Sequence, residues 1–356
     1  MKNIFLFTLT IAFLNSCVKE DYFGLSDSAD ILNIQVSNQA DQAQINSETH
    51  IIILNMTPGV DISKSVIQEL ELSSFATTSK QVGDTLNLTH DNVLEIIAEN
   101  GNIVSWKLEA QYASAELQLS NTDFNMWYQT AKGYYEPGAA ADNTVWCTGN
   151  AGTSLLGLYA TTPYDKDNDD YAVKMETLDN GRLSAAFGAP ISAGSIMTGV
   201  FNADNIDPAN PRAAIDFGTL FTGRPSALRI SYSYTPGKVN KDKDGNKLDY
   251  GDMCDIYAIL EVRQDDEARR LATAWFRSGD EQQDSKDLEL VFSYGKLDDS
   301  FPDYMKPTNG LYVNSDIIDY VLPTHIIFVA SSSYNGDHFA GAVGSTLYID
   351  NLWLEY

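Results

Sequence analysis

Strand-length segments in which apolar and polar residues alternate are the feature that most limits how this chain can fold. Ile230, Tyr232 and Tyr234 are separated by serines, and similar stripes begin at Ile256 and at Leu288. Alternation with a period of two buries one side of a β-strand, whereas no helical periodicity continues here beyond two turns. The stripes therefore predict an all-β chain whose strands form packed antiparallel sheets.

The composition of the chain changes near residue 114. Residues 29–113 contain short strand patterns, a hairpin turn at Asn100-Gly101 and a single tryptophan, Trp106, on the last strand. We expect a small Ig-like β-sandwich there, which resembles the immunoglobulin-like spacer modules of Bacteroidetes surface lipoproteins. Residues 114–356 are dense in aromatic residues, glycines and acidic turns, and predict one large jelly-roll β-sandwich. The best short helical candidate is Ser63–Leu72.

The N-terminal segment has the composition of a secretion signal. Lys2 supplies a positive charge, and the uncharged stretch from Ile4 to Leu14 is too short to span a bilayer. Ser16 before Cys17 resembles the lipobox of bacterial lipoproteins, in which the cysteine is acylated and becomes the new N-terminus. Residues 1–16 are therefore predicted to be a signal peptide, and Cys17 the lipidation site. The alternative is an ordinary secretory signal with a cysteine there by chance.

The residues that follow predict where the protein is held. Residues 17–28 form a polar tether, and Lys19-Glu20-Asp21 at its start resembles the surface-export signal of Bacteroidetes lipoproteins. We expect the protein to be lipid-anchored in the outer membrane, with its folded part facing the cell exterior.

The charge balance limits the partners. Without its first 16 residues the chain carries 22 basic and 49 acidic side chains. Nucleic acids and anionic lipid headgroups are themselves polyanions, so strong acidity argues against both as ligands. A neutral or basic ligand remains open.

Two cysteines remain after Cys17, namely Cys147 and Cys254. In an oxidising compartment they could pair as a disulfide. Each lies in an apolar or aromatic stretch, which favours two free, buried thiols instead.

A set of segments beyond residue 114 occurs in consistent order in one known family. They are Trp146–Asn150, Ala193–Gly199, Phe217-Gly218, Arg224-Pro225 leading into Ile230–Tyr234, Asp255–Leu260, Phe339–Leu347 and Ile349–Asn351. In these the chain resembles the putative carbohydrate metabolism domain (PCMD) family of Bacteroidetes lipoproteins. The resemblance implies a β-sandwich related to carbohydrate-binding modules and a role in glycan metabolism. It carries no catalytic residue signature over to this chain.

A cluster of aromatic residues is the first candidate for a glycan site. Sugar rings have an apolar C–H face that packs on flat aromatic rings, while carboxylates and amides bind the hydroxyls. The alternative is that these rings fill the core of the sandwich. The next choice is the loop that contains Tyr334, Asn335 and Asp337. The residues predicted to bind glycan are Trp127, Tyr134, Tyr135, Glu136 and Trp146.

The sequence gives little sign of metal or cofactor chemistry. None of its four histidines has a partner at ligand spacing, and no cofactor is expected. A structural calcium ion is considered at two places, Asp350 and the loop Asp242–Asn246. The loop partly resembles a calcium-binding loop, but Gly251 stands at the twelfth position, where such loops have a bidentate glutamate. The alternative for Asp350 is a carboxylate that caps the amide of a bulge. Such a bulge is predicted at Asp350-Asn351, because the apolar phase of the last strand slips there.

These observations favour a surface-exposed protein that binds glycan through its C-terminal sandwich. The first alternative is a glycoside hydrolase on the same scaffold, which would need a pair of catalytic carboxyl groups. The sequence cannot single out such a pair among 49 acidic residues, and Glu136 is the one residue whose setting suggests a catalytic role. The second alternative is an adhesion or structural subunit. Motifs of serine hydrolases, nucleotide-binding proteins and zinc proteases are absent from the sequence.

Overall fold

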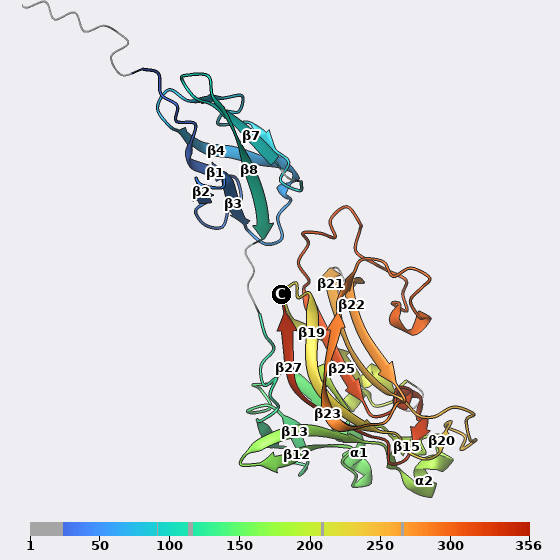
Figure 1. Cartoon of the computed structure of the whole chain (residues 1–356). Helices are drawn as coiled ribbons and strands as arrows, with labels where there is room; N and C mark the ends of the chain where they lie inside the picture. The colour runs from blue at the N-terminus through green and yellow to red at the C-terminus, as the bar shows by residue number, and fades with distance from the viewer. Residues whose placement is uncertain (1–23, 91, 113–116, 208–209, 265–266) are drawn as a thin grey trace, which may run out of the picture. The chain divides into compact units, whose positions relative to one another are not determined.

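The computed structural model describes residues 24–90, 92–112, 117–207, 210–264 and 267–356. The chain forms two compact units, Met1–Ala113 and Ser114–Tyr356 (Figure 1). The predicted signal peptide, Cys17 and the start of the tether lie outside the described residues. Across the ranges that are described, no helix is both long and apolar enough to cross a bilayer.

The first unit is a small β-sandwich of two sheets around one core. Trp106 lies fully buried between the sheets, and its indole N–H donates to the carbonyl of Ala29 at 2.9 Å. One sheet has the order β1 (Ile31–Val36), β4 (Ser65–Leu72) and β6 (Thr85–Leu86). The other has the order β2 (Gln44–Asn46), β3 (Ile51–Met56), β8 (Ile103–Tyr112), β7 (Asn92–Ile97) and β5 (Thr77–Thr78), with β3 and β8 parallel.

The short helix expected at Ser63–Leu72 is wrong. One 3₁₀ turn, η1 (Ile62–Lys64), is followed directly by strand β4. Glu69 and Glu71 alternate with Leu70 and Leu72 along β4, and both leucines pack against the core. The segment forms a strand and not a helix because its alternation of polar and apolar residues, with a period of two, lets it pair with β1.

The second unit is a larger sandwich of antiparallel sheets, which confirms the all-β prediction. Among its described residues, three two-stranded sheets, two short helices and five further 3₁₀ turns complete it. The eight-stranded sheet has the order β11 (Trp146–Thr148), β16 (Ser195–Phe201), β25 (His325–Ser331), β21 (Cys254–Gln264), β22 (Glu267–Ser278) and β24 (Ser293–Tyr294), with β17 (Ile215–Phe217) beside β16 and β18 (Thr219–Leu220) beside β25.

The five-stranded sheet has the order β12 (Thr161–Asp167), β13 (Asp170–Glu176), β27 (Thr346–Glu355), β19 (Ala227–Thr235) and β23 (Gln282–Val291). The two-stranded sheets are β9 (Trp127–Gln129) with β10 (Tyr135–Pro137), β14 (Leu178–Asp179) with β15 (Ile191–Ser192), and β20 (Asn240–Lys241) with β26 (Gly341–Ala342). The helices are α1 (Asn150–Thr153) and α2 (Gly181–Ala186), and the turns are η2 (Ser154–Leu156), η3 (Ala203–Asn205), η4 (Pro211–Ala214), η5 (Asp303–Met305) and η6 (Gly336–His338).

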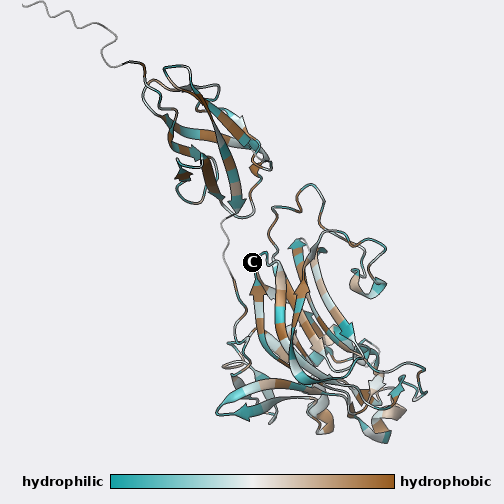
Figure 2. Ribbon diagram, in the orientation of Figure 1, coloured by the Kyte–Doolittle hydropathy of each residue, from teal (hydrophilic) through white to brown (hydrophobic). Residues whose placement is uncertain are grey.

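The core of this unit lies between the two sheets. Ile256, Ala258 and Leu260 of β21 belong to the same buried cluster as Leu228 and Ile230 of β19. Figure 2 shows hydrophobic and hydrophilic residues interleaved along the strands, as this arrangement requires. Apolar residues also gather on the outer face of the eight-stranded sheet, so its central strand β25 is buried on both sides.

Strand β27 contains the predicted bulge. Its partner β19 advances two residues, from Arg229 to Ser231, while β27 covers the three positions that separate Trp353 from Asp350. Asn351 supplies the irregular conformation with a φ of 49°. The prediction of a bulge at this position is confirmed, and the bulge turns Trp353 to the outside of the sheet.

Both remaining cysteines are free and buried, as predicted. Cys147 is 7% exposed, and Cys254 is fully enclosed in the main core. Burial raises the pKa of the Cys254 thiol to about 12, so this thiol stays protonated.

Candidate functional site

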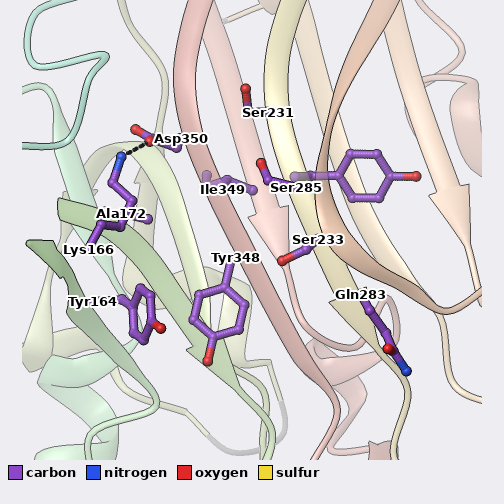
Figure 3. A pocket seen from close by; sticks show the side chains of 11 residues that line it. Tyr164, Lys166, Ala172, Ser231, Ser233, Gln283, Ser285, Tyr348, Ile349 and Asp350 are labelled. Carbon is purple, nitrogen blue, oxygen red and sulfur yellow. Dashed lines mark hydrogen bonds and ion pairs between the residues drawn. The ribbon is translucent and has the colours of Figure 1, made fainter. Parts of the chain in front are cut away.

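A hollow of about 300 Å³ crosses the outer face of the five-stranded sheet (Figure 3). All five strands of the sheet contribute to its lining, which combines aromatic rings, hydroxyls, an amide and one ion pair. We call this hollow the tyrosine groove. The side chains that line it include Tyr164 and Lys166 from β12, Ser231 and Ser233 from β19, Gln283 and Ser285 from β23, and Tyr348 and Asp350 from β27.

Two tyrosines form the aromatic part of the groove. The rings of Tyr164 and Tyr348 meet edge to face, with centroids 4.9 Å apart and an interplanar angle of 69°. Strand β13 runs between their strands, and the small side chain of Ala172 stands opposite Tyr164. Tyr164 remains 46% exposed. The rings therefore present an open apolar face above the sheet.

The rest of the groove is built from neutral polar groups. Ser231 and Ser233 point outward from β19 because their neighbours Ile230 and Tyr232 belong to the core. The hydroxyl of Ser231 donates to Asp287 at 2.8 Å. Burial raises the pKa of Tyr348, so its hydroxyl stays neutral at physiological pH. The groove thus offers groups that both donate and accept hydrogen bonds.

An ion pair closes one end of the groove. The ammonium of Lys166 donates to Asp350 and, at 2.9 Å, to Asp170. Burial raises the pKa of Asp350, although hydrogen bonds from Lys166 and from the amide of Asn351 oppose this shift. Burial likewise opposes the charge of Lys166, but its two carboxylate partners outweigh this and raise its pKa. Lys166 thus bridges the carboxylates of Asp350 and Asp170 at this end of the groove.

At Asp350 the structure shows the contacts of a carboxylate that caps a bulge, while the expectation of calcium there stays a prediction. The ammonium of Lys166 donates to Asp350, which also accepts the amide N–H of Asn351 at 2.8 Å. In the loop at Asp242 the carboxylate accepts backbone N–H groups of Asp244 and Asn246, as in a hairpin tip. Within the described part of the chain, no group of three or more His, Cys, Asp or Glu side chains is arranged to hold a metal ion.

The predicted aromatic cluster does not form one surface. Trp146 is 2% exposed and packs edge to face on Phe124 and Phe328, so its ring belongs to the core. Trp127 packs against the same core and donates its indole N–H to the carbonyl of Phe124 at 2.7 Å. The Trp146 ring therefore offers no free face to a sugar, and Trp127 is partly buried against the same core.

The rest of the cluster lies on strand β10 and beside it. Tyr134 is 8% exposed, whereas Tyr135 is 44% exposed. Glu136 is 6% exposed and accepts the hydroxyl of Thr148 at 2.9 Å, but its second oxygen has no hydrogen-bond partner among the described residues. Burial raises the pKa of Glu136 to about 7. None of the three lines the tyrosine groove.

Sequence reasoning missed Tyr164 and Tyr348 as a pair. They lie far apart in the chain and become neighbours only through the strand order β12-β13-β27. One signal was available for Tyr348, which stands at an outward position between the inward residues Leu347 and Ile349. An aromatic ring at an outward strand position is a candidate binding residue.

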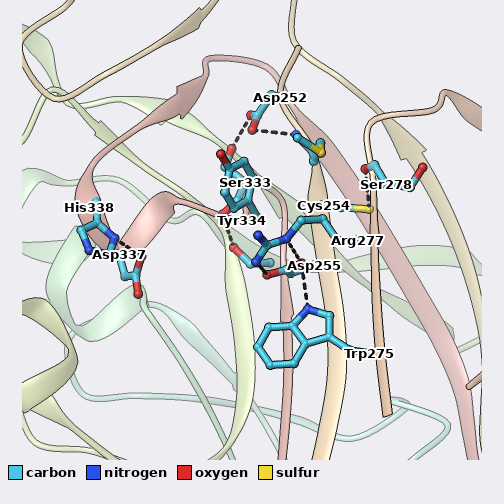
Figure 4. A network of polar contacts seen from close by, with 12 residues as sticks. Asp252, Cys254, Asp255, Trp275, Arg277, Ser278, Ser333, Tyr334, Asp337 and His338 are labelled. Atoms are coloured by element: carbon cyan, nitrogen blue, oxygen red, sulfur yellow. Dashed lines mark hydrogen bonds and ion pairs between the residues drawn. The ribbon is translucent and has the colours of Figure 1, made fainter. Parts of the chain in front are cut away.

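The second predicted loop joins a polar network on the outer face of the eight-stranded sheet (Figure 4). Arg277 forms a bidentate ion pair with Asp255 at 2.7 and 2.6 Å. The same guanidinium lies between the rings of Tyr304 and Tyr334, at 3.8 and 4.2 Å from their centroids. The indole N–H of Trp275 donates to Asp255 at 3.1 Å. The charged groups and aromatic rings of this network therefore find their interaction partners within the network itself.

Asp252 fastens the neighbouring loops in a similar way. Its buried carboxylate accepts the hydroxyls of Ser333 and Ser345 at 2.5 and 2.6 Å and the amide of Ala342 at 2.8 Å. Asp337, from the predicted loop, pairs with Arg212 and His338. We interpret this region as a framework that fixes loop positions.

The fold and the groove define a class: antiparallel β-sandwich proteins with an open, tyrosine-lined groove on one sheet. Residues 118–355 match the family described as "Putative carbohydrate metabolism domain" (PCMD). The chain belongs to this family.

Several solved structures resemble the chain. One, described as a putative glycoside hydrolase from Bacteroides thetaiotaomicron, is 24% identical and has a TM-score of 0.55, covering 92% of this chain and 97% of that one. Another, described in the same words and from Bacteroides vulgatus, is 24% identical with a TM-score of 0.51, covering 65% of this chain and 96% of that one. At this identity the likeness shows a shared fold. No curated protein matches the chain.

Proposed function

We propose that this protein binds glycan and that the tyrosine groove is the binding site. The observation that carries the proposal is the outward pair Tyr164 and Tyr348 beside the hydroxyls and amide of Ser231, Ser233 and Gln283. Aromatic rings pack on the C–H faces of sugars, and neutral donor–acceptor groups match sugar hydroxyls. Membership of a carbohydrate metabolism family supports the same ligand class.

The charge of the site favours a neutral glycan. Lys166, the basic residue that lines the groove, is already paired with Asp350 and Asp170 and is not free to attract a uronate or sulfate. The whole chain carries a formal net charge of −26, which repels anionic polymers at long range.

The N-terminal residues support a proposal for the position of the protein on the cell. We propose that Cys17 carries the lipid anchor, that Lys19-Glu20-Asp21 directs export to the cell surface, and that the first sandwich is an Ig-like spacer. In this arrangement the tether and spacer hold the glycan-binding unit away from the outer membrane.

A glycoside hydrolase is the second candidate function. The family description and the two relatives described as glycoside hydrolases favour it. Hydrolysis of this kind needs two carboxyl groups about 5–10 Å apart. Among the described residues that line the groove, Asp350 is the only one with a carboxyl group, and it is paired with Lys166. We therefore rank binding above hydrolysis, and adhesion to another protein third.

Tyr348→Ala and Tyr164→Ala test the proposal on a glycan array. We expect each variant to lose about tenfold in affinity for neutral glycans that the wild type binds, because one ring face is lost. The melting temperature should stay close to that of the wild type, since both rings lie outside the core.

Tyr135→Ala is the matched control, because Tyr135 lies outside the groove and is about as exposed as Tyr164. It should bind like the wild type. Reducing-end release from any array hit would favour the hydrolase. Loss of binding in Tyr135→Ala with intact binding in both groove variants would place the site at the β9–β10 hairpin and contradict the proposal.

A further inference from the structure

The indole of Trp353 lies on the same face of the five-stranded sheet as the tyrosine groove. Before the bulge in β27, the buried side chains are Leu347 and Ile349. After the bulge they are Leu352 and Leu354. Without the extra residue Trp353 would share the inward parity of Leu347 and Ile349. The bulge instead leaves it 52% exposed.

Trp353 is in line with the groove tyrosines along one strand. Tyr348, Asp350 and Trp353 of β27 stand opposite Ser233, Ser231 and Arg229 of β19. Figure 1 shows β27 and β19 side by side over this length. The two ends are four steps apart along β19, from Arg229 to Ser233, which corresponds to about 13 Å at the usual rise of a strand.

The surroundings of Trp353 suit a polar ring ligand. Arg229 stands beside it and pairs with Glu289 at 2.7 Å and with Glu355 at 2.6 Å. These ion pairs are about half exposed, so their remaining donor and acceptor positions face solvent around the indole. An apolar ring face bordered by such groups is the same combination that the groove offers.

We propose that Trp353 is a distal subsite of the tyrosine groove and that the ligand is a neutral chain of about four sugar rings lying along β27. This inference rests on the proposed function of the groove. A disaccharide on Tyr348 cannot reach Trp353 across about 13 Å, while a longer oligosaccharide contacts both rings.

Binding of oligosaccharide ladders tests the proposal. The probes are cello-, xylo-, malto- and manno-oligosaccharides, each from disaccharide to hexasaccharide, measured by calorimetry on the full chain. For a ladder that binds, wild-type affinity should rise up to the tetrasaccharide and then level off. Trp353→Ala should lose about tenfold for the tetrasaccharide and nothing for the disaccharide.

Two further variants separate the possible failures. Trp353→Phe keeps an aromatic face and should retain most of the gain with length, while Leu220→Ala removes an exposed apolar side chain from the other sheet and should bind like the wild type. If Trp353→Ala follows the wild-type ladder while Tyr348→Ala loses binding, the subsite is wrong and the groove stands. If no ladder binds the wild type, or Tyr348→Ala changes nothing, both proposals fall.

Discussion

At the scale of single residues, Glu136 is the clearest case of a group in an unfavourable setting. Its carboxyl is 6% exposed, accepts one hydrogen bond from Thr148 and leaves its second oxygen without a partner in the described structure. Burial raises its pKa from 4.5 to about 7. The folded protein therefore holds a proton on this residue at pH values where the unfolded chain releases it.

Glu136 should make stability fall as pH rises. Its stabilising contribution is complete below about pH 4.5 and is lost as pH passes through about 7, because only the unfolded chain ionises easily in this window. The loss is about 3 kcal/mol. Chemical denaturation of the wild type at a series of pH values measures it.

Glu136→Gln is the control, because glutamine can still accept the Thr148 hydroxyl and does not titrate. Its free energy of unfolding should stay flatter than that of the wild type across the same pH window. Parallel curves for the two proteins would contradict the assignment.

At the scale of elements, the bulge in β27 decides which side chains reach the outer face. Asn351 holds it with a φ of 49°, and its backbone and side-chain N–H groups donate to Asp350 at 2.8 and 3.1 Å. Asparagine tolerates this left-handed conformation, whereas a β-branched residue does not.

Asn351→Val should therefore destabilise the protein by about 1–2 kcal/mol, and Asn351→Gly by less, because glycine adopts a positive φ freely. Thermal unfolding of both variants measures the difference. If valine proves as stable as glycine, the backbone at this position is not strained. The valine variant should also weaken oligosaccharide binding if the altered register turns Trp353 away.

The same strand shows what the sequence could predict and what it could not. The slip in apolar phase between Ile349 and Leu352 predicted the bulge, because each strand face must keep its apolar residues inside. Applied to neighbouring residues, that rule also places Tyr348 and Trp353 outside. The partner Tyr164 could not be found this way, since strand order in a sheet depends on contacts between distant segments. Trp146 was ambiguous for the same reason, because its core neighbour Phe328 comes from a distant strand.

At the scale of the whole molecule, the proposed location gives the remaining prediction. Cys17→Ala should move the protein from the membrane fraction to the soluble fraction, because the acyl chains supply most of the membrane affinity. Replacement of Lys19, Glu20 and Asp21 by alanine should leave the protein lipidated and membrane-bound but protected from protease added to intact cells. Fractionation and whole-cell protease digestion measure the two effects separately.

Whether the protein faces the cell exterior also decides which glycans it can meet. A groove that binds long neutral chains, as proposed for Tyr348 and Trp353, meets intact polysaccharide only if it faces the medium. Replacement of Ser26 and Asp27 by alanine changes the same tether without touching the charged triplet and should leave surface digestion unchanged. If the Lys19–Asp21 variant is digested on intact cells as fast as the wild type, the triplet does not direct export. If Cys17→Ala stays in the membrane fraction after a salt wash, the anchor lies elsewhere.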